Sequence, residues 1–409
     1  MTKTGQTEQA PKRLMVLGGN FFQMTAIKRA RELGYYVISV DYLPGNPGHR
    51  FANEYHNVST IDKEAVLALA KELGIDGILS YASDVSAPTA AYVAEALGLP
   101  TNPYHAVMTL THKDLFRSFM KENGLLMPES RMFTDREEAR AFFGAMELPV
   151  MIKPVDSSGS KGVVKVTERT QFEAAFDEAM SYSIGKQILV EQYIAKKGYQ
   201  IDGDGFVKDG QIVFFGVMDQ HNHVPLSPHV PMGLSWPSIQ EKKYQEQARR
   251  QIQEIFTRLG MRFGAFNFEY IIGQDGRIYI LEIGPRNGGN LIPDTIRYAS
   301  GVDMIEASIR ACLGDPYEEA LQGTQNRIAT SYIIHTDRSG VFREFRIHPE
   351  LLPHVVESHL FVEAGDKVNA YRNAGFGLGA MLLSFDSVEE MDRMMDRMWE
   401  YAEVVVDDE

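Results

Sequence analysis

The stretch FNFEYIIGQDGRIYILEIGPRNGGN, residues 266–290, decides what this region of the chain forms. Two apolar runs flank Asp275 and Gly276, a pair that is typical of the two-residue turn of a β-hairpin. In such a hairpin the numbers of paired residues have a constant sum, so Glu269 lies opposite Glu282 on one face. Directly opposed like charges destabilise a sheet unless something positive lies between them. The spacing therefore predicts that the two glutamates share a cation.

Carboxylate oxygens favour a hard ion, so we expect Mg²⁺, with Mn²⁺ as the alternative. A different interpretation is an exposed hairpin whose glutamates face water, and a register slip of one residue would move Glu269 to the other face. Two features favour the metal. Both glutamates lie in apolar strands, and the second runs into GPRNGGN, where Arg286 stands among small residues that allow backbone to approach a ligand.

A second motif, VMIKPVDSSGSKGVVKV, covers residues 150–166 and places Lys153 in an apolar strand. A loop of small polar residues follows, and successive backbone N–H groups and hydroxyls in such a loop suit phosphate oxygens. The loop residues are Ser157, Ser158, Gly159, Ser160, Lys161 and Gly162. The plainer alternatives are an ordinary hairpin connection and a lysine at a sheet edge that extends its amine to water. The spacing of a P-loop is absent.

Alternating apolar runs and helix-like segments predict a doubly wound α/β unit over residues 12–110. Residues 111–315 are expected to form a second domain, with a small subdomain at about 128–194 and a long amphipathic helix at 238–259. The last segment, 316–409, mixes strands with the helix SVEEMDRMMDRMWEYA, whose methionines are expected to face a core.

The composition of the chain argues against several classes of function. The 409 residues hold 41 Lys and Arg against 55 Asp and Glu, a formal net charge of −14 without a basic patch, so we expect no nucleic-acid partner. No apolar run approaches the roughly 18 residues of a membrane span, so we expect no membrane role. The single cysteine, Cys312, and the polar start of the chain predict a cytoplasmic protein, with Cys312 packed in the interior.

Five motifs in this order, VMIKP, SSGSKG, ILVEQYI, FNFEY and LEIGPRNGG, resemble the ATP-grasp superfamily over nearly the whole chain. The likeness is to the carboxylate–amine ligase type, with biotin carboxylase and phosphoribosylglycinamide synthetase as similar relatives. The resemblance implies an α/β fold: a doubly wound N-terminal domain, an ATP-grasp α+β domain with a small lid subdomain, and a C-terminal α+β segment.

The resemblance also implies a role for each matching residue. Lys113 and Lys153 would contact the ATP phosphates, and the loop from Ser157 to Gly162 would close over them. Arg286 would steady the phosphoryl group in transfer, acting with Lys153 as a catalytic residue. The segment Glu191, Gln192, Tyr193 and Ile194 would hold adenine, Gln200 would contact the ribose, and Glu269 and Glu282 would bind the metal.

The sequence departs from the family pattern at Gly284, where many members carry an asparagine metal ligand. Asn267 is expected opposite Gly284 in the hairpin register, so Asn267, Asn287, Asn290 or water could supply the missing ligand. At Gln200 many members have a glutamate, but a glutamine still donates and accepts hydrogen bonds.

The function that the resemblance implies is an ATP-dependent ligase. It would activate a small-molecule carboxylate as an acyl phosphate and join it to an amine or thiol, releasing ADP and phosphate. The alternatives are a bicarbonate-activating carboxylase or purine-pathway ligase, and a nucleotide-binding protein without turnover. A homodimer is the habit of the family.

Other residues carry weaker signals. Gly18, Gly19 and Asp41 suggest a dinucleotide fingerprint that lacks its later glycine; in an ATP-grasp protein these positions and Asp84 line the acceptor cleft, although Asp84 could instead cap a helix. The segment HNHVPLSPHVP, residues 221–231, favours a solvated loop over a zinc site, because no cysteine or helical spacing accompanies its histidines. It could equally form a substrate lid.

Overall fold

The computed structural model describes residues 10–157, 159–223, 226 and 230–408. Its N-terminal part is a parallel sheet in the order β3-β2-β1-β4. The strands are β1 (Arg13–Leu17), β2 (Tyr36–Val40), β3 (Glu54–His56) and β4 (Gly77–Ser80), and the helices that follow in sequence are α1 (Phe21–Glu32), α2 (Lys63–Leu73) and α3 (Ala87–Leu97). This alternation of strand and helix is the doubly wound pattern expected from the sequence.

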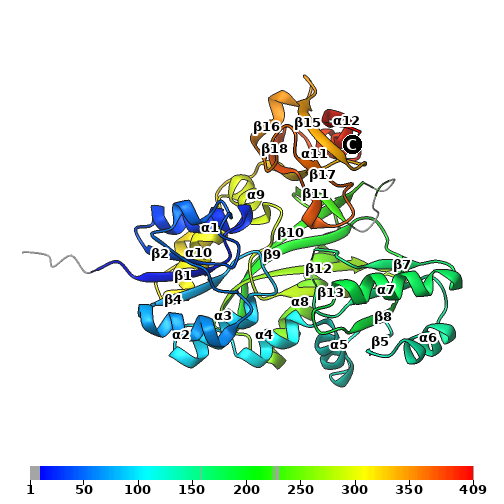
Figure 1. The fold of residues 1–409 in the computed structure, drawn as a ribbon, viewed down its shortest axis with the longest axis horizontal. Coiled ribbons are helices and arrows are strands. Elements are labelled where there is room, and N and C mark those ends of the chain that lie inside the picture. The colour runs from blue at the N-terminus through cyan, green and yellow to red at the C-terminus, as the bar shows by residue number, and fades with distance from the viewer. Residues whose placement is uncertain (1–9, 158, 224–225, 227–229, 409) are drawn as a thin grey trace, which may run out of the picture.

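A helix from much later in the chain completes this unit. Alternate residues of the strands face opposite layers, and the two layers are α2 with α3 and α1 with α10 (Met304–Cys312). Ile305, Ile309 and Cys312 of α10 pack beside α1 (Figure 1). A parallel sheet is stable only when both faces are covered. Cys312 is buried there, as expected, and burial raises the pKa of its thiol to about 12.

The largest sheet has eight strands in the order β13-β12-β9-β10-β11-β14-β18-β16. Their bounds are β9 (Gln200–Lys208), β10 (Gln211–Asn222), β11 (Pro231–Trp236), β12 (Gly264–Ile272), β13 (Ile278–Gly284), β14 (Ile328–Ile334), β16 (Val355–Leu360) and β18 (Gly379–Phe385). Helix α8 (Lys242–Leu259) buries Ile252 and Phe256 against Phe266 and Phe268 of β12. The helix begins four residues after the expected Ser238, because Ser238 and Ile239 donate hydrogen bonds to Asp219 of β10.

A smaller sheet, β5-β8-β6-β7, lies to one side (Figure 1, right). It consists of β5 (Ser130–Phe133), β6 (Val150–Pro154), β7 (Val164–Val166) and β8 (Ile188–Gln192), with α6 (Arg136–Ala145) and α7 (Phe172–Tyr182) packed on it. The sequence pattern did not indicate β5, which is too short to show an alternation. Helices α4 (Tyr104–Thr111) and α5 (Lys113–Glu122) lead into this subdomain.

The C-terminal residues form a lobe at the top of Figure 1. A three-stranded sheet, β17-β15-β19, comprises β15 (Gly340–Ile347), β17 (Lys367–Val368) and β19 (Ala402–Asp407). The single helix expected here is broken into α11 (Val388–Met395) and α12 (Met398–Tyr401), and Met391, Met394, Met395 and Met398 are buried as expected. Helix α9 (Ile292–Ser300) precedes α10. Within the described residues no helix has the length and apolar character to cross a membrane.

Candidate active site

Three carboxylates lie side by side on neighbouring strands of the large sheet. Glu269 of β12 pairs with Glu282 of β13 and, on its other side, with Asp202 of β9. The expected pairing of the two glutamates is confirmed, but the expected two-residue turn is wrong. Ile272 pairs with Ile278 around a longer turn, and a bulge at Leu281 then shifts the register by one residue. The longer turn and the bulge cancel, and the glutamates still meet.

The charges of this row oppose one another. Burial, followed by the neighbouring Asp202 and Glu282, raises the pKa of Glu269 well above its usual range. Burial also raises the pKa of Asp202 to about 6, although Asn267 donates a hydrogen bond to it. A carboxylate whose ionised form is this disfavoured needs a positive partner. Three converging acids with oxygen donors therefore fit a hard divalent cation, which the row would hold.

A second row lies two residues further along the same strands. Asn267 pairs with Asp204 on β9 and with Gly284 on β13, as the hairpin register predicted for Gly284. The Asn267 amide donates to Asp202 Oδ1 at 2.8 Å and to Asp204 Oδ1 at 3.1 Å. Burial raises the pKa of Asp204 to about 7, although the hydrogen bonds that Gly288 N–H and Asn267 donate to it act to lower this pKa. Asn267 thus holds the two aspartates through its amide nitrogen.

The three asparagines expected as replacement ligands differ in placement. Asn267 and Asn290 line the main cavity, whereas Asn287 accepts a hydrogen bond from Ser308 on α10. Asp202, which the sequence reasoning missed, stands directly beside Glu269. Its signal was available, since a strand paired with FNFEY brings Asp202 to the face of the glutamates. Asp202 is a further candidate metal ligand.

Gly284 has a packing reason to lack a side chain. A Cβ atom there would lie 2.6 Å from Asp84 Oδ1 and 2.8 Å from Cζ of Arg286. Asp84 and Arg286 form an ion pair that joins the loop after β4 to the loop after β13. Burial opposes the charge of Arg286, but Asp84 outweighs it and raises the pKa of the guanidinium. Asp84 therefore anchors Arg286 and does not cap α3, whose N-cap is Ser86.

Lys153 and Glu191 form a buried ion pair, and Arg117 joins it from α5. Burial disfavours the charge of Glu191, but Arg117 and Lys153 outweigh it and lower its pKa to about 2. Burial lowers the pKa of Lys153, partly offset by Glu191. The Glu191 carboxylate therefore belongs to this pair, so any adenine contact by this segment comes from the backbone after it. The sequence reasoning missed Arg117.

Lys113 connects the loop to the acids. Its amine lies 3.2 Å from Glu282 Oε2 and donates to the backbone oxygen of Ser157 at 3.0 Å. Gln200 donates to Glu269 Oε2 at 2.8 Å, so the expected ribose residue also contacts the acidic row. The loop reaches the C-terminal lobe, because Ala374 N–H donates to the carbonyl of Gly159. The expected phosphate and metal residues thus form one connected network.

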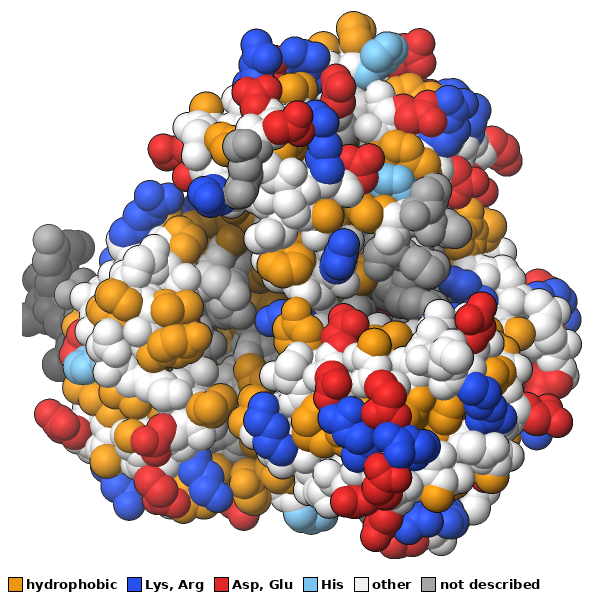
Figure 2. Space-filling view, turned by 45° about the vertical axis from the view of Figure 1, so that its right-hand side comes forward, with side chains coloured by type: hydrophobic (Ala, Val, Ile, Leu, Met, Phe, Trp, Pro, Cys, Tyr) orange, Lys and Arg blue, Asp and Glu red, His pale blue; other side chains and the backbone are white. Residues whose placement is uncertain are grey.

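A cavity of about 640 Å³ lies where the parts of the molecule meet, and Figure 2 shows a hollow in the surface between the lobes. Asn20, Phe22 and Asp84 line it from the N-terminal unit. Ser158 lies outside the described residues, and Gly162 is not among the lining residues. The other expected site residues line it: Lys113, Lys153, Ser157, Gly159, Ser160, Lys161, Glu191, Gln192, Tyr193, Ile194, Gln200, Glu269, Glu282 and Arg286.

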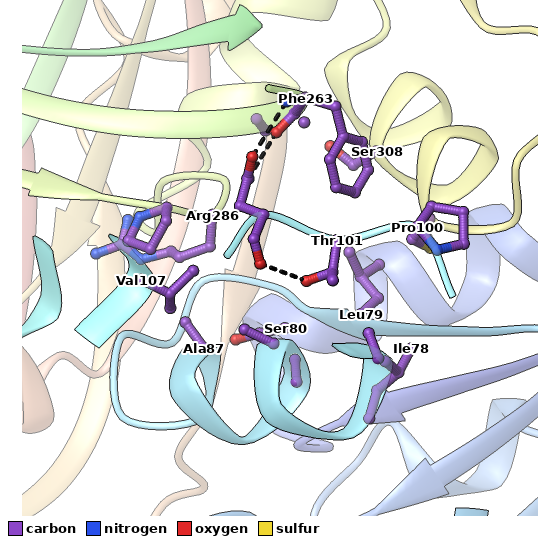
Figure 3. Close-up of a pocket in the computed structure, with 18 of the residues that line it drawn as sticks. Ile78, Leu79, Ser80, Ala87, Pro100, Thr101, Val107, Phe263, Arg286 and Ser308 are labelled. Atoms are coloured by element: carbon purple, nitrogen blue, oxygen red, sulfur yellow. Dashed lines mark hydrogen bonds between the residues drawn. The ribbon is translucent and has the colours of Figure 1, made fainter. Parts of the chain in front are cut away.

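Gly18, Gly19 and Asp41 do not line the described part of this cavity. Asp41 accepts hydrogen bonds from Gly19 N–H and from the Asn46 side chain, so it holds its own loop. A much smaller cavity of about 80 Å³ lies behind Arg286 and is walled by Leu79, Val107 and other apolar residues (Figure 3). It marks the packing of the N-terminal unit on the large sheet.

The histidine segment differs from its expectation as a solvated loop. His221 is 2% exposed in β10, and His223, 8% exposed, follows this strand. His223 stacks on Trp399 and hydrogen-bonds His335, so the first part of the segment packs against the C-terminal lobe. His229 lies outside the described residues. The pairing of β10 with β11 cannot be read from so short and polar a segment, so the burial of His221 and His223 was not expected from the sequence.

Comparison with known proteins agrees with this geometry. Residues 146–294 match the family model of the ATP-grasp domain, so the chain contains an ATP-grasp domain there. The chain is 26% identical over 318 residues to a formate-dependent phosphoribosylglycinamide formyltransferase from Anaeromyxobacter dehalogenans, which covers 75% of this chain and 78% of that protein. Across such relatives the chain spans from 25% of a carbamoyl phosphate synthase to 87% of an N5-carboxyaminoimidazole ribonucleotide synthase.

Two solved structures share the whole fold. An L-amino acid ligase from Bacillus licheniformis superposes with a TM-score of 0.81 at 20% identity, over 98% of this chain and 100% of that chain. The biotin carboxylase domain of the 2-oxoglutarate carboxylase from Hydrogenobacter thermophilus was solved as a dimer with MgADP and bicarbonate. It superposes with a TM-score of 0.74 at 17% identity, over 98% of this chain and 92% of that chain. The expected ATP-grasp fold is confirmed, and the similar proteins include a formate-dependent formyltransferase, an N5-carboxyaminoimidazole ribonucleotide synthase and an L-amino acid ligase.

Proposed function

We propose that this protein is an ATP-dependent ligase that joins a small-molecule carboxylate to an amine. The observation that carries the proposal is the row of Asp202, Glu269 and Glu282, which faces the same cavity as Lys113 and Lys153. Acids and lysines in one cavity suit a metal-bound triphosphate. The activities of the related proteins support the same reaction class.

In this proposal the nucleotide lies between the small sheet and the large sheet. Backbone groups of Gln192, Tyr193 and Ile194 hold the adenine, and Gln200 lies next to the ribose. Lys113, Lys153 and the loop residues Ser157, Ser158, Gly159, Ser160, Lys161 and Gly162 bind the phosphates. Mg²⁺, or Mn²⁺, held by Glu269 and Glu282 with Asp202 as the third acid, supplies charge neutralisation when bound.

The substrate carboxylate attacks the γ-phosphorus of ATP, the bond to the β–γ bridging oxygen breaks, and ADP leaves. The product is an acyl phosphate. A neutral amine then attacks the acyl carbon, and inorganic phosphate leaves as the amine loses a proton. Arg286, held by Asp84, and Lys153, held by Glu191, stabilise the charge on the transferring phosphoryl group. Positioning and electrostatics supply the catalysis, without a protein nucleophile.

A phosphate-release screen of the purified chain tests this proposal. Amino acids and small carboxylates are supplied singly and in pairs with ATP and Mg²⁺. We expect ADP and phosphate to form in equal amounts only when a carboxylate and an amine are both present. ADP release with bicarbonate alone would replace the proposal with a carboxylase. ATP binding without turnover for any pair would replace it with a non-catalytic nucleotide-binding protein.

The proposal extends to the organisation of the chain. We expect the three parts named from the sequence, 12–110, 111–315 and 316–409 with a lid at 128–194, to behave as units that move around the cavity. Limited proteolysis with and without ATP tests these boundaries.

A cytoplasmic homodimer is the expected form, supported by the dimeric biotin carboxylase domain of the same fold. Cell fractionation tests the location, and light scattering tests the dimer.

A further inference from the structure

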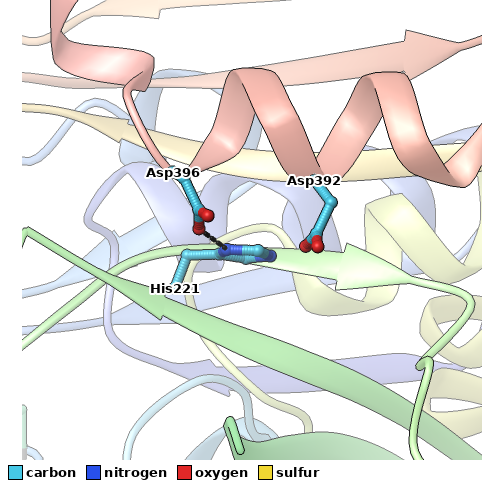
Figure 4. Close-up of side chains that lie close together, drawn as sticks. All are labelled: His221, Asp392 and Asp396. Atoms are coloured by element: carbon cyan, nitrogen blue, oxygen red, sulfur yellow. Dashed lines mark ion pairs between the residues drawn. The ribbon is translucent and has the colours of Figure 1, made fainter.

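A second cluster of possible ligands lies where α11 crosses β10, outside the lining of the main cavity. His221 projects from β10 towards Asp392 and Asp396 of the C-terminal lobe (Figure 4). One ligand atom from each of the three residues lies within 4.8 Å of the others. The His221 side chain is 1% exposed, whereas Asp396 is 62% exposed. The cluster is therefore anchored on a buried histidine and open to solvent on its acidic side.

One hydrogen bond holds the ring of His221 in place. Nε2 lies 2.9 Å from Ser235 Oγ, and the Ser235 hydroxyl also lies 3.5 Å from the carbonyl of Asp219. In the tautomer whose Nε2–H donates to Ser235 Oγ, Nδ1 carries a lone pair that faces the two aspartates. Among the described residues Nδ1 has no hydrogen-bond partner; Asp396 Oδ1, at 3.8 Å, lies within ion-pair distance (dashed in Figure 4) but beyond a hydrogen bond.

The two carboxylates are held in place by a neighbour. The hydroxyl of Tyr199 donates to Asp392 Oδ1 at 2.8 Å and lies 3.3 Å from Asp396 Oδ1. A buried lone pair and two carboxylates then face one point, an arrangement that calls for a positive charge. An imidazole nitrogen whose other nitrogen donates to a hydroxyl, beside oriented carboxylates, is the arrangement of a metal ligand set with its supporting hydrogen bonds.

We propose that His221, Asp392 and Asp396 bind a divalent transition-metal ion of the zinc class. Imidazole nitrogen and carboxylate oxygen are both ligand types that Zn²⁺ binds, and three protein ligands leave a fourth position for water. Mg²⁺ prefers an all-oxygen set, which separates this site from the row of acids in the cavity. The ion would connect β10 of the large sheet to the end of α11 in the C-terminal lobe. Tyr199, which bonds both aspartates, directly precedes Gln200 of the main cavity.

Zinc titration of the full-length protein tests the site. The background is the Glu269→Gln/Glu282→Gln variant, which removes the proposed magnesium ligands from the measurement. A chromophoric chelator competes for Zn²⁺, and thermal unfolding is followed in parallel. We expect one Zn²⁺ per chain and a higher melting temperature with Zn²⁺. Adding Asp392→Asn and Asp396→Asn, which keep the side-chain shape, abolishes both effects.

Two controls make the outcome decisive. Asp408→Asn removes an exposed carboxylate elsewhere in the C-terminal lobe and should leave zinc binding unchanged. His221→Ala should abolish binding, and circular dichroism confirms that each variant is folded. If zinc binding survives the double Asn substitution, or if the starting background binds no zinc, the site is disproved. Neither result depends on ligase activity, so the site and the proposed function fail separately.

Discussion

Arg117 donates a hydrogen bond from Nε to Glu191 Oε2 at 2.6 Å, in a part of the molecule where both side chains are almost fully buried. The same guanidinium donates to the carbonyl of Leu281 at 3.0 Å. Leu281 is the bulged residue that sets the register of Glu282. One side chain on α5 thus connects β8, whose last two residues belong to the expected adenine segment, to β13, which carries the candidate metal ligand Glu282.

Removing the charge of Glu191 should destabilise the protein strongly. Glu191→Gln leaves Arg117 and Lys153 buried without their anion, and breaking a buried pair in this way costs about 3–5 kcal/mol. Urea unfolding followed by circular dichroism measures the loss. The matched control is Glu173→Gln, whose partners Arg136 and Arg140 are exposed. Ion pairs in contact with solvent contribute far less than buried ones, so equal losses in the two variants would contradict the prediction.

Glu282→Gln should reduce ADP formation by about 100-fold or more and leave the fold intact. The substitution keeps the side-chain shape but removes a charge from the acidic row, and electrostatic contributions of this size are typical of groups that act on a transferring phosphoryl group. Coupled detection of ADP measures the rate. Glu403→Gln, at an exposed position on β19, is the control. Near-normal turnover in Glu282→Gln would remove the metal role from this residue.

Gly284→Ala should lower the melting temperature and weaken the Asp84–Arg286 pair. The new Cβ has no room, since it would lie 2.6 Å from Asp84 Oδ1. Gly284→Asn, which introduces the residue common in the family, should be worse and should not improve activity. Gly289→Ala is the control, because nothing lies within 4 Å of a Cβ at that position. Thermal unfolding compares the three; a Gly284→Asn variant with normal stability and higher turnover would contradict the packing argument.

Asp204 should make the metal-free protein less stable as the pH rises. Its pKa is raised from 3.8 to about 7 in the folded state, so the folded chain holds this proton more tightly than the unfolded chain. The stabilising contribution is complete below about pH 4 and is lost as the pH rises through about 7. Asp204→Asn should therefore reduce the fall in melting temperature between about pH 5 and about pH 8. The melting temperature is measured in steps of roughly one pH unit, with a chelator present to keep the protein free of metal. Asp408→Asn should keep the wild-type profile.

Much of the site follows from local sequence. The alternation of strands and helices predicted the doubly wound unit, and the motif order predicted the ATP-grasp fold. The pairing of Glu269 with Glu282 was also predicted. The predicted two-residue turn is wrong, because the real turn is longer, and the bulge at Leu281 restores the predicted pairing. Register in a hairpin depends on local spacing, and this is why the prediction reached the right pair.

Other parts depended on contacts between residues far apart in the chain. Asp202 joins the acidic row only because β9 lies beside β12, and Arg117 meets Glu191 only because α5 packs against β5 at the edge of the small sheet. His221 meets Asp392 across 171 positions of sequence, since the C-terminal lobe covers the end of β10. Sequence by itself determined the residue types and the spacing within each hairpin, because these follow from backbone geometry. Only the tertiary structure decided which buried charges share a partner, because burial and charge pairing arise where separate strands and helices pack.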